Sequence, residues 1–112
     1  HVVIVTGGTG NPYFTTDTAA CLRGVELQVD TVLKATNVDG IYSSDPKKDA
    51  AATKYDTITF DQVLEKQLGV MDLTAIVLCR ENNMPLVVFD ASVKGALLAL
   101  TAGQSIGTRV VQ

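Results

Sequence analysis

The sequence predicts an α/β fold with a mostly parallel central sheet and helices on both of its faces. Short runs rich in β-branched residues alternate along the chain with longer segments in which apolar residues recur at helical spacing. The runs VVIV (residues 2–5) and PLVVFD (85–90) are apolar almost throughout rather than at every second position. Continuous apolar runs are typical of strands that a parallel sheet buries on both faces. We expect residues 1–112 to form a single unit.

The expected elements follow in the order strand, glycine-rich loop, helix, strand, hairpin, two helices, strand, helix and strand. The expected strands are residues 2–5, 30–36, 85–90 and 107–112, and the expected helices lie within residues 15–29, 60–68, 71–83 and 92–103. Asp39-Gly40 is a tight-turn signal, and the polar segment 43–56 reads as an exposed loop. Helix starts are indicated by side chains that favour the N-cap position, namely Thr15, Thr16 or Asp17 for the first helix, Asp61 for the second and Asp72 for the third.

The composition excludes several functional classes. The net charge is −3, so a surface for nucleic acid or anionic membranes is not expected. No apolar run approaches the roughly 18 residues of a membrane helix. Cys21 and Cys79 lie in apolar, helix-like segments. We expect them to be reduced, buried thiols of a cytoplasmic protein, with a disulfide as the alternative.

Both ends of the chain lie in predicted strands, because it begins HVVIV and stops at TRVVQ. We therefore expect these residues to be part of a longer protein. His1 receives no chemical role.

The segment TGGTGNPYFTTDTAA, Thr6 to Ala20, joins the first predicted strand to the first helix. Glycines let backbone N–H groups turn toward a ligand, and a helix start adds free N–H groups and partial positive charge. Together they favour an anion such as phosphate. The loop lacks the Gly-Lys-Ser/Thr ending of a Walker A motif and the third glycine of a dinucleotide fingerprint. A tight strand-to-helix turn with a capped helix remains the alternative.

The segment KATNVDGIYSSDP, which follows the second predicted strand, suits a nucleoside. Tyr42 offers a flat face on which a base can stack, and Asp45 can accept hydrogen bonds from a base or ribose. Thr36 and Asn37 lie at a strand end, where such sheets meet their ligands. The alternatives are an ordinary turn at Asp45-Pro46 and a packing role for Tyr42. Lys34 forms a salt bridge or reaches a phosphate.

At this point the residues resemble a known family. GTGNPYFTTDTAA and LKATNVDGIYSSDP, with YDTITFDQVLEKQLGVMDLTA, ENNMPLVVFD and GTRVV, resemble the uridine-nucleotide branch of the amino acid kinase family along the whole chain. The resemblance implies a three-layer α/β/α, carbamate kinase-like fold whose amino-terminal half is absent. It also implies transfer of the γ-phosphoryl group of ATP, with Mg²⁺, to UMP, giving UDP and ADP for pyrimidine biosynthesis. The alternatives are an aspartate or glutamate kinase, or a non-catalytic nucleotide-binding regulatory module.

The resemblance also implies roles for particular residues. The expected UMP-binding residues are Thr9, Gly10, Asn11, Pro12, Tyr13, Phe14, Thr15 and Thr16, and the expected ATP-binding residues are Thr36, Asn37, Tyr42 and Asp45. Asn37 is the weaker candidate, because the family often has lysine there. Asp17 is a candidate for orienting a phosphate-bound Mg²⁺, with helix capping as the alternative. No set of metal ligands is predicted.

Several parts that the family shares do not occur in these residues. Neither a KLSG strand end nor a GGGN loop is present, and the glycine loop contains no cationic side chain. Phosphoryl transfer needs cations to neutralise the crowded phosphate charge. We therefore expect the main catalytic lysine in the other half and no activity from this chain alone. The family further implies a homohexamer, activation by GTP and inhibition by UTP.

Overall fold

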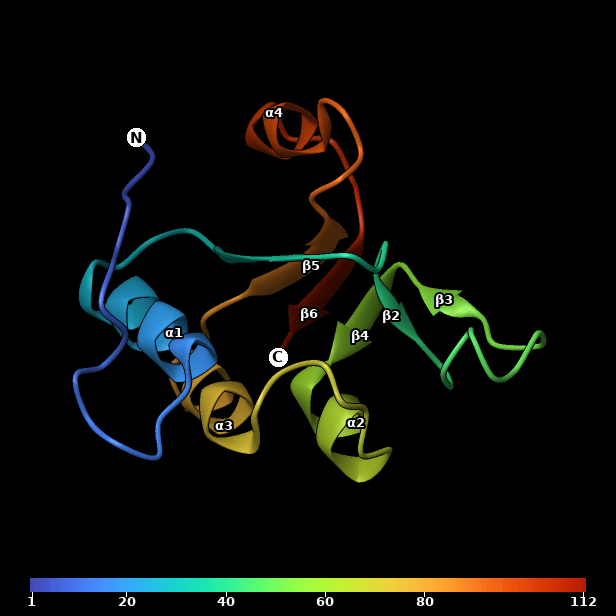
Figure 1. Cartoon of the computed structure of the whole chain (residues 1–112), viewed down its shortest axis with the longest axis horizontal. Helices are drawn as coiled ribbons and strands as arrows, with labels where there is room; N and C mark the ends of the chain where they lie inside the picture. Colours follow the sequence, from blue (N-terminus) through green and yellow to red (C-terminus); the bar gives the residue numbers. More distant parts are fainter.

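The computed structural model describes residues 1–112 and confirms the predicted α/β class. Its elements are α1 (Thr16–Glu26), β1 (Val32–Thr36), β2 (Ile41–Tyr42), β3 (Lys54–Tyr55), β4 (Thr57–Thr59), α2 (Phe60–Glu65), α3 (Leu73–Glu81), β5 (Leu86–Asp90), α4 (Ala96–Thr101) and β6 (Thr108–Val111). Helices α1, α2 and α3 lie on one side of the main sheet and α4 lies on the other (Figure 1). The arrangement therefore has the three layers that the resemblance implied.

The main sheet has four strands in the order β1-β5-β6-β4. The β1–β5 and β4–β6 pairs are parallel, and the β5–β6 pair is antiparallel. The prediction of a mostly parallel sheet is thus confirmed, with one antiparallel pair at its centre. Strands β2 and β3 form a separate antiparallel pair, called here the β2–β3 hairpin (residues 41–55).

The hydrophobic core lies between the main sheet and the helices α1, α2 and α3. Strand β5 is its centre, because residues 86–89 are all buried, as a strand covered on both faces requires. Phe60 and Ile76 are among its largest fully buried side chains. Cys21 and Cys79 belong to this core and are free thiols, so the prediction of buried, reduced cysteines is confirmed.

Two of the predicted N-caps are confirmed and one is wrong. Thr15 caps α1 and Asp72 caps α3. Helix α2 is capped by Thr59 instead of Asp61. Thr59 ends β4 in an extended conformation, and its hydroxyl accepts the Gln62 amide at 3.1 Å while the Gln62 side chain accepts the Thr59 amide at 3.1 Å. This reciprocal capping box satisfies two backbone donors and leaves Asp61 in the first turn.

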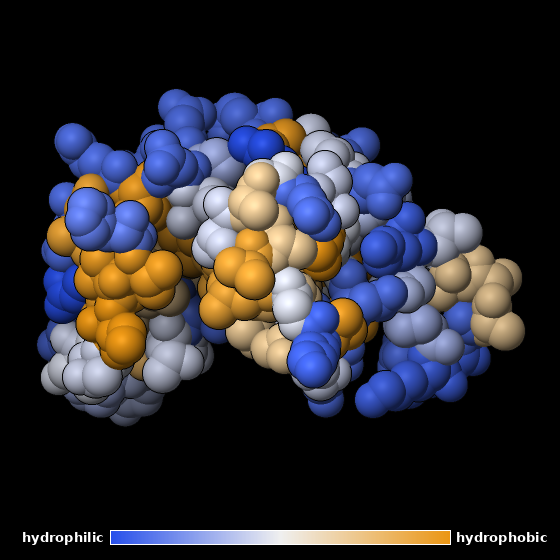
Figure 2. Space-filling view, turned by 90° about the horizontal axis from the view of Figure 1, so that it is seen from above, coloured by the Kyte–Doolittle hydropathy of each residue, from blue (hydrophilic) through white to orange (hydrophobic).

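The prediction of a strand at residues 2–5 is wrong. These residues have no strand partner, and Val2 and Ile4 are 80% and 86% exposed. A strand needs a neighbouring strand for its ladder hydrogen bonds, which β-branched composition alone does not supply. Hydrophobic residues gather in two areas of the face seen in Figure 2, over this amino-terminal stretch and over α4, where Leu97 and Leu98 are exposed.

Two further expectations need correction. Helix α4 begins at Ala96 rather than near residue 92, because Gly95 has a φ of 82° and interrupts helical geometry. The predicted hairpin is not closed at Asp39-Gly40. Instead β2 pairs with β3 across the exposed polar segment 43–53. None of the helices is both long enough and apolar enough to cross a membrane.

Candidate nucleotide site

A cavity of about 550 Å³ lies beside the carboxyl end of β1. Its wall is formed by the end of β1 and the turn after it, by the first strand and loop of the β2–β3 hairpin, by residues 66–70 after α2, and by Val88 of β5. Thr36, Tyr42 and Asp45 are all among its lining residues, whereas Asn37 is not. The structure therefore brings together three of the four residues predicted to contact ATP. We call this space the hairpin cavity.

Tyr42 is held in place by a residue that the sequence had not indicated. Its hydroxyl donates a hydrogen bond to Asp39 Oδ1 at 2.7 Å. This bond, together with desolvation and the charge of Asp39, raises the pKa of Tyr42 above its ordinary value. The tether restricts the orientation of the ring at the cavity wall.

Asp45 has the turn role that the sequence left open as an alternative. Its Oδ1 accepts the Lys47 amide at 2.9 Å, and its backbone carbonyl accepts the amides of Lys48 and Asp49. Oδ2 makes no hydrogen bond within the chain. Asp45 thus shapes the loop and still presents a free carboxylate oxygen beside the hairpin cavity.

Two lysines line the hairpin cavity and supply positive charge there. Lys34 Nζ lies 2.7 Å from Asp17 Oδ1, and both side chains are about one quarter exposed, at 24% and 23%. Of the two alternatives for Lys34, the salt bridge is therefore the one observed. Lys66 was missed by the sequence reasoning. Its Nζ donates to the Tyr55 hydroxyl at 3.0 Å and lies 5.2 Å from the centre of that ring.

The glycine loop is open to solvent and lies outside this cavity. Gly7, Gly8 and Gly10 all have positive φ angles, which explains the need for glycine in these turns. The Asn11 amide donates to the Thr9 hydroxyl at 3.1 Å, so these two residues form a local turn. Tyr13 also has a positive φ, of 70°, and its side chain is fully exposed. None of residues 9–16 lines the hairpin cavity.

Asp72 connects the end of the glycine loop to α3. Its carboxylate accepts hydrogen bonds from the Thr15 hydroxyl, from the Thr18 hydroxyl at 3.2 Å and from the Ala75 amide at 2.7 Å. Desolvation opposes ionisation of this carboxyl. The hydrogen bonds from Thr15, Ala75 and Thr18 and the nearby charge of Lys34 outweigh that effect and lower its pKa. The N-terminal ends of α1 and α3 therefore share one anionic side chain.

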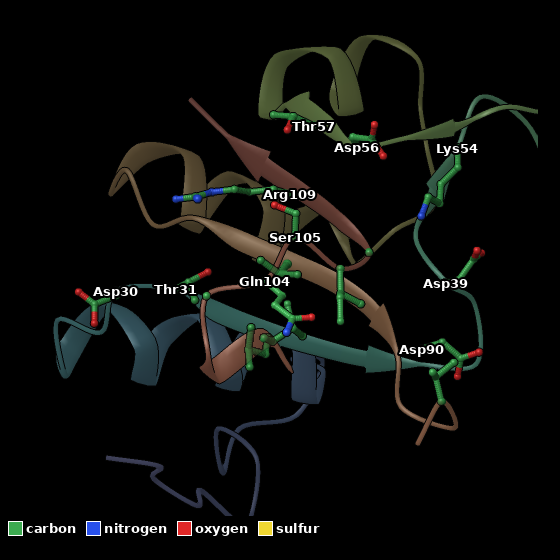
Figure 3. A pocket seen from close by; sticks show the side chains of 17 residues that line it. Asp30, Thr31, Asp39, Lys54, Asp56, Thr57, Asp90, Gln104, Ser105 and Arg109 are labelled. Atoms are coloured by element: carbon green, nitrogen blue, oxygen red, sulfur yellow. The ribbon is translucent and has the colours of Figure 1, made fainter. Parts of the chain in front are cut away.

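A larger cavity of about 910 Å³ contains none of the predicted ligand-binding residues. Figure 3 shows charged side chains around it, including Asp30, Asp56, Lys54 and Arg109. Acidic and basic groups are mixed along its wall. We assign no ligand to this space.

The fold and the site define a three-layer α/β protein with a ligand-sized cavity beside the carboxyl end of a parallel strand. The sequence profile of the amino acid kinase family matches residues 1–90. The chain therefore belongs to the amino acid kinase family.

Individual relatives within the family show which of its members the chain is similar to in sequence. The chain is 64% identical over 110 residues to a uridylate kinase of Alcanivorax borkumensis, covering 98% of this chain and 44% of the relative. It is 60% identical over 112 residues to a uridylate kinase of Acinetobacter baumannii, covering 100% of this chain and 46% of the relative. The chain thus spans less than half the length of these relatives.

Solved structures of UMP kinases are also similar to this chain. The UMP kinase of Bacillus anthracis superposes with a TM-score of 0.90 at 33% identity, over 93% of this chain and 43% of that one. The UMP kinase of Ureaplasma parvum gives 0.87 at 42% identity, over 94% and 45%. An aspartate kinase from Synechocystis is more distant, with 0.68 at 27% identity, over 86% and 15%.

Proposed function

We propose that this chain forms the nucleotide-binding part of an enzyme that transfers the γ-phosphoryl group of ATP to UMP, giving UDP and ADP. The single observation that carries the proposal is the hairpin cavity. Three residues proposed to contact ATP from sequence alone line it, and its volume of about 550 Å³ is that of a small-molecule site. The relatives named uridylate kinase support UMP as the acceptor.

The residues of the hairpin cavity suit the chemistry of a nucleoside triphosphate. In this proposal Tyr42 provides a flat face for the adenine, and the free Oδ2 of Asp45 accepts from the base or ribose. Lys34 and Lys66 provide positive charge for the phosphates, since both line the cavity. Lys34 is paired with Asp17, so a phosphate in the hairpin cavity would compete with that carboxylate for the ammonium group.

In this proposal the acceptor UMP binds at Thr9, Gly10, Asn11, Pro12, Tyr13, Phe14, Thr15 and Thr16. The Lys34–Asp17 salt bridge supports this arrangement, because it links the first turn of α1, directly after this loop, with the hairpin cavity. The start of α1, where the loop ends, therefore lies close to the donor site. The loop contributes backbone positioning rather than charge.

Mg²⁺ with ATP belongs to the proposal as well. No group of three or more His, Cys, Asp or Glu side chains lies close enough together to hold a metal ion. Mg²⁺ is usually bound through substrate phosphates and only one or two carboxylates. A metal that arrives with the nucleotide therefore does not need a cluster of three protein ligands. Asp17 is our candidate for the protein carboxylate. Homohexamer formation, activation by GTP and inhibition by UTP stay predictions.

Binding measurements on single variants test the two subsites. Tyr42→Ala should weaken ATP binding by about tenfold, because base–aromatic stacking contributes roughly 1–3 kcal/mol, and should leave UMP binding unchanged. Tyr13→Ala is the matched control and should affect UMP but not ATP. Titration calorimetry with each nucleotide gives the dissociation constants. Equal ATP affinity in Tyr42→Ala and the unaltered chain would remove ATP from the hairpin cavity.

A turnover assay tests whether this chain needs the remaining part of the enzyme for phosphoryl transfer. We expect no conversion of UMP when the chain alone is mixed with ATP and Mg²⁺, because the glycine loop contributes no cation. Addition of the remaining part of the A. borkumensis relative should restore UDP formation. Turnover by the chain alone near ordinary kinase rates of about 1–100 s⁻¹ would show this view to be wrong.

The similarity to an aspartate kinase supports a second candidate acceptor, the carboxylate of an amino acid. Thermal shift with UMP and with aspartate separates the two. Stabilisation by UMP alone is the expected result, and stabilisation by aspartate alone would favour the second candidate.

A further inference from the structure

The β2–β3 hairpin carries Tyr42 but does not belong to the main sheet. Its own ladder consists of the pairs Ile41–Tyr55 and Tyr42–Lys54. A two-stranded hairpin of this size is at best marginally stable by itself in water. The hydrogen bond to Asp39 orients the Tyr42 ring, and contacts with the rest of the fold must hold the hairpin itself beside the hairpin cavity.

Thr108, the first residue of β6, makes that connection. Its side chain is fully buried, with 0% exposure. The hydroxyl accepts the Ile41 amide at 2.8 Å and donates to the Tyr55 carbonyl. One hydroxyl thus bonds to both strands of the hairpin, at the residue pair where the hairpin meets the main sheet. We propose that Thr108 is a positioning residue that fixes the β2–β3 hairpin, and with it Tyr42, for binding of the donor nucleotide.

Two neighbouring glycines show that the backbone is tightly packed on both sides of the contact between Thr108 and the hairpin, which we call the joint. A Cβ atom on Gly40 would lie 2.5 Å from Thr108 Oγ1 and 3.0 Å from Lys54 Cδ. Gly107 has a φ of 74°, and a Cβ atom there would collide with the Val88 carbonyl oxygen. The backbone at Gly107 therefore packs directly on β5, and the backbone at Gly40 packs directly on the Thr108 hydroxyl.

Thr108 acts through another residue rather than on the ligand. It does not line the hairpin cavity, whereas Ile41 and Tyr42 do. Removal of the hydroxyl leaves the Ile41 amide and the Tyr55 carbonyl without their partner, and buried backbone groups without partners are costly. The hairpin then loses its hydrogen bonds to β6 and keeps the Lys66–Tyr55 contact and the buried side chain of Ile41. The Tyr42 ring, still bonded to Asp39, is held less firmly at the cavity wall. This consequence for ATP rests on the function proposed above.

Thr108→Val, which deletes the hydroxyl and nearly keeps the shape, provides the test in the full chain. We expect the ATP dissociation constant to rise about tenfold with the UMP dissociation constant unchanged. Amide hydrogen exchange at Ile41 should become faster, a readout that does not depend on any ligand. Thr108→Ser should restore both properties, because it keeps the hydroxyl. Thr101→Val is the matched control, since the exposed Thr101 hydroxyl bonds only within α4.

Gly40→Ala perturbs the same joint from the hairpin side and serves if Thr108→Val does not fold. It should raise the ATP dissociation constant and also speed amide exchange at Ile41. The exchange rate is the deciding measurement for this variant, because Gly40 itself lines the hairpin cavity. Unchanged ATP affinity in either folded variant, or equal weakening of ATP and UMP, would overturn the role of Thr108. Absence of ATP binding by the unaltered chain would instead overturn the proposed function, so the two failures are distinguishable.

Discussion

Replacement of Asp72 tests whether one carboxylate joins the starts of two helices. Asp72→Ala removes the acceptor of the Ala75 amide, and loss of such an N-cap costs about 1 kcal/mol. It also removes the acceptor of the buried Thr18 hydroxyl, which adds about 1–3 kcal/mol. We expect the free energy of unfolding to fall by about 2–4 kcal/mol. Asp72→Asn, which keeps one carbonyl oxygen as a cap, should lose about 1 kcal/mol.

The pH dependence follows from the lowered pKa of Asp72. Its folded-state pKa lies below the ordinary value of 3.8, so the ionised form is the one that the folded state favours. Its contribution is fully present above about pH 5 and is lost as the pH falls through the folded-state pKa. The difference in stability between the unaltered chain and Asp72→Asn should therefore shrink below about pH 4.

Urea denaturation followed by circular dichroism, at pH 7 and near pH 3, measures both effects. Asp61→Ala is the control, because the 73% exposed side chain of Asp61 makes only a surface ion pair with Arg80, a class that contributes about 0–1 kcal/mol. A loss in Asp72→Ala no larger than in Asp61→Ala would refute the shared-cap interpretation. So would a difference between the unaltered chain and Asp72→Asn that persists undiminished near pH 3.

Three further changes test the fold by the same urea denaturation. Thr59→Ala breaks the capping box of α2 and should cost about 1 kcal/mol; a value near zero would return the cap to Asp61. Gly107→Ala places a side chain at positive φ against the Val88 carbonyl and should cost at least about 1–3 kcal/mol, so a neutral effect would contradict the close contact of β6 and β5. Ile58→Ala empties a site that is only 2% exposed and should cost about 2–5 kcal/mol, while Ile58→Val should cost about 0.5–1.5 kcal/mol; equal losses would argue against tight packing there.

Local patterns predicted the elements whose signals are contained in a few neighbouring residues. The apolar run 85–90 became the buried strand β5, and Asp72 capped α3 as its position indicated. Short or interrupted elements were missed or misplaced. Strand β4 has only three residues, and β3 lies within a segment that is otherwise polar. Residues 2–5 have strand composition but no partner strand, which a local pattern does not report.

Part of the candidate site was predicted because its residues are close together in the sequence. Thr36, Tyr42 and Asp45 were found because they lie within one short, distinctive segment, and the structure places all three at one cavity. Lys66, Asp39 and Thr108 were missed, because each acts on a residue of another element or turn. No sequence spacing predicts that Lys66 contacts Tyr55 or that the Thr108 hydroxyl bonds to two strands.

By itself, the sequence determined the α/β class, the glycine turns, most helix starts and the kinship with amino acid kinases, since each depends on residues that are close together in the chain. Only the tertiary structure decided which side chains share the hairpin cavity, that Lys34 pairs with Asp17, and that Thr108 bonds both strands of the hairpin. Those contacts depend on distances between segments far apart in sequence. Such distances follow from the packing of the whole chain rather than from any local pattern.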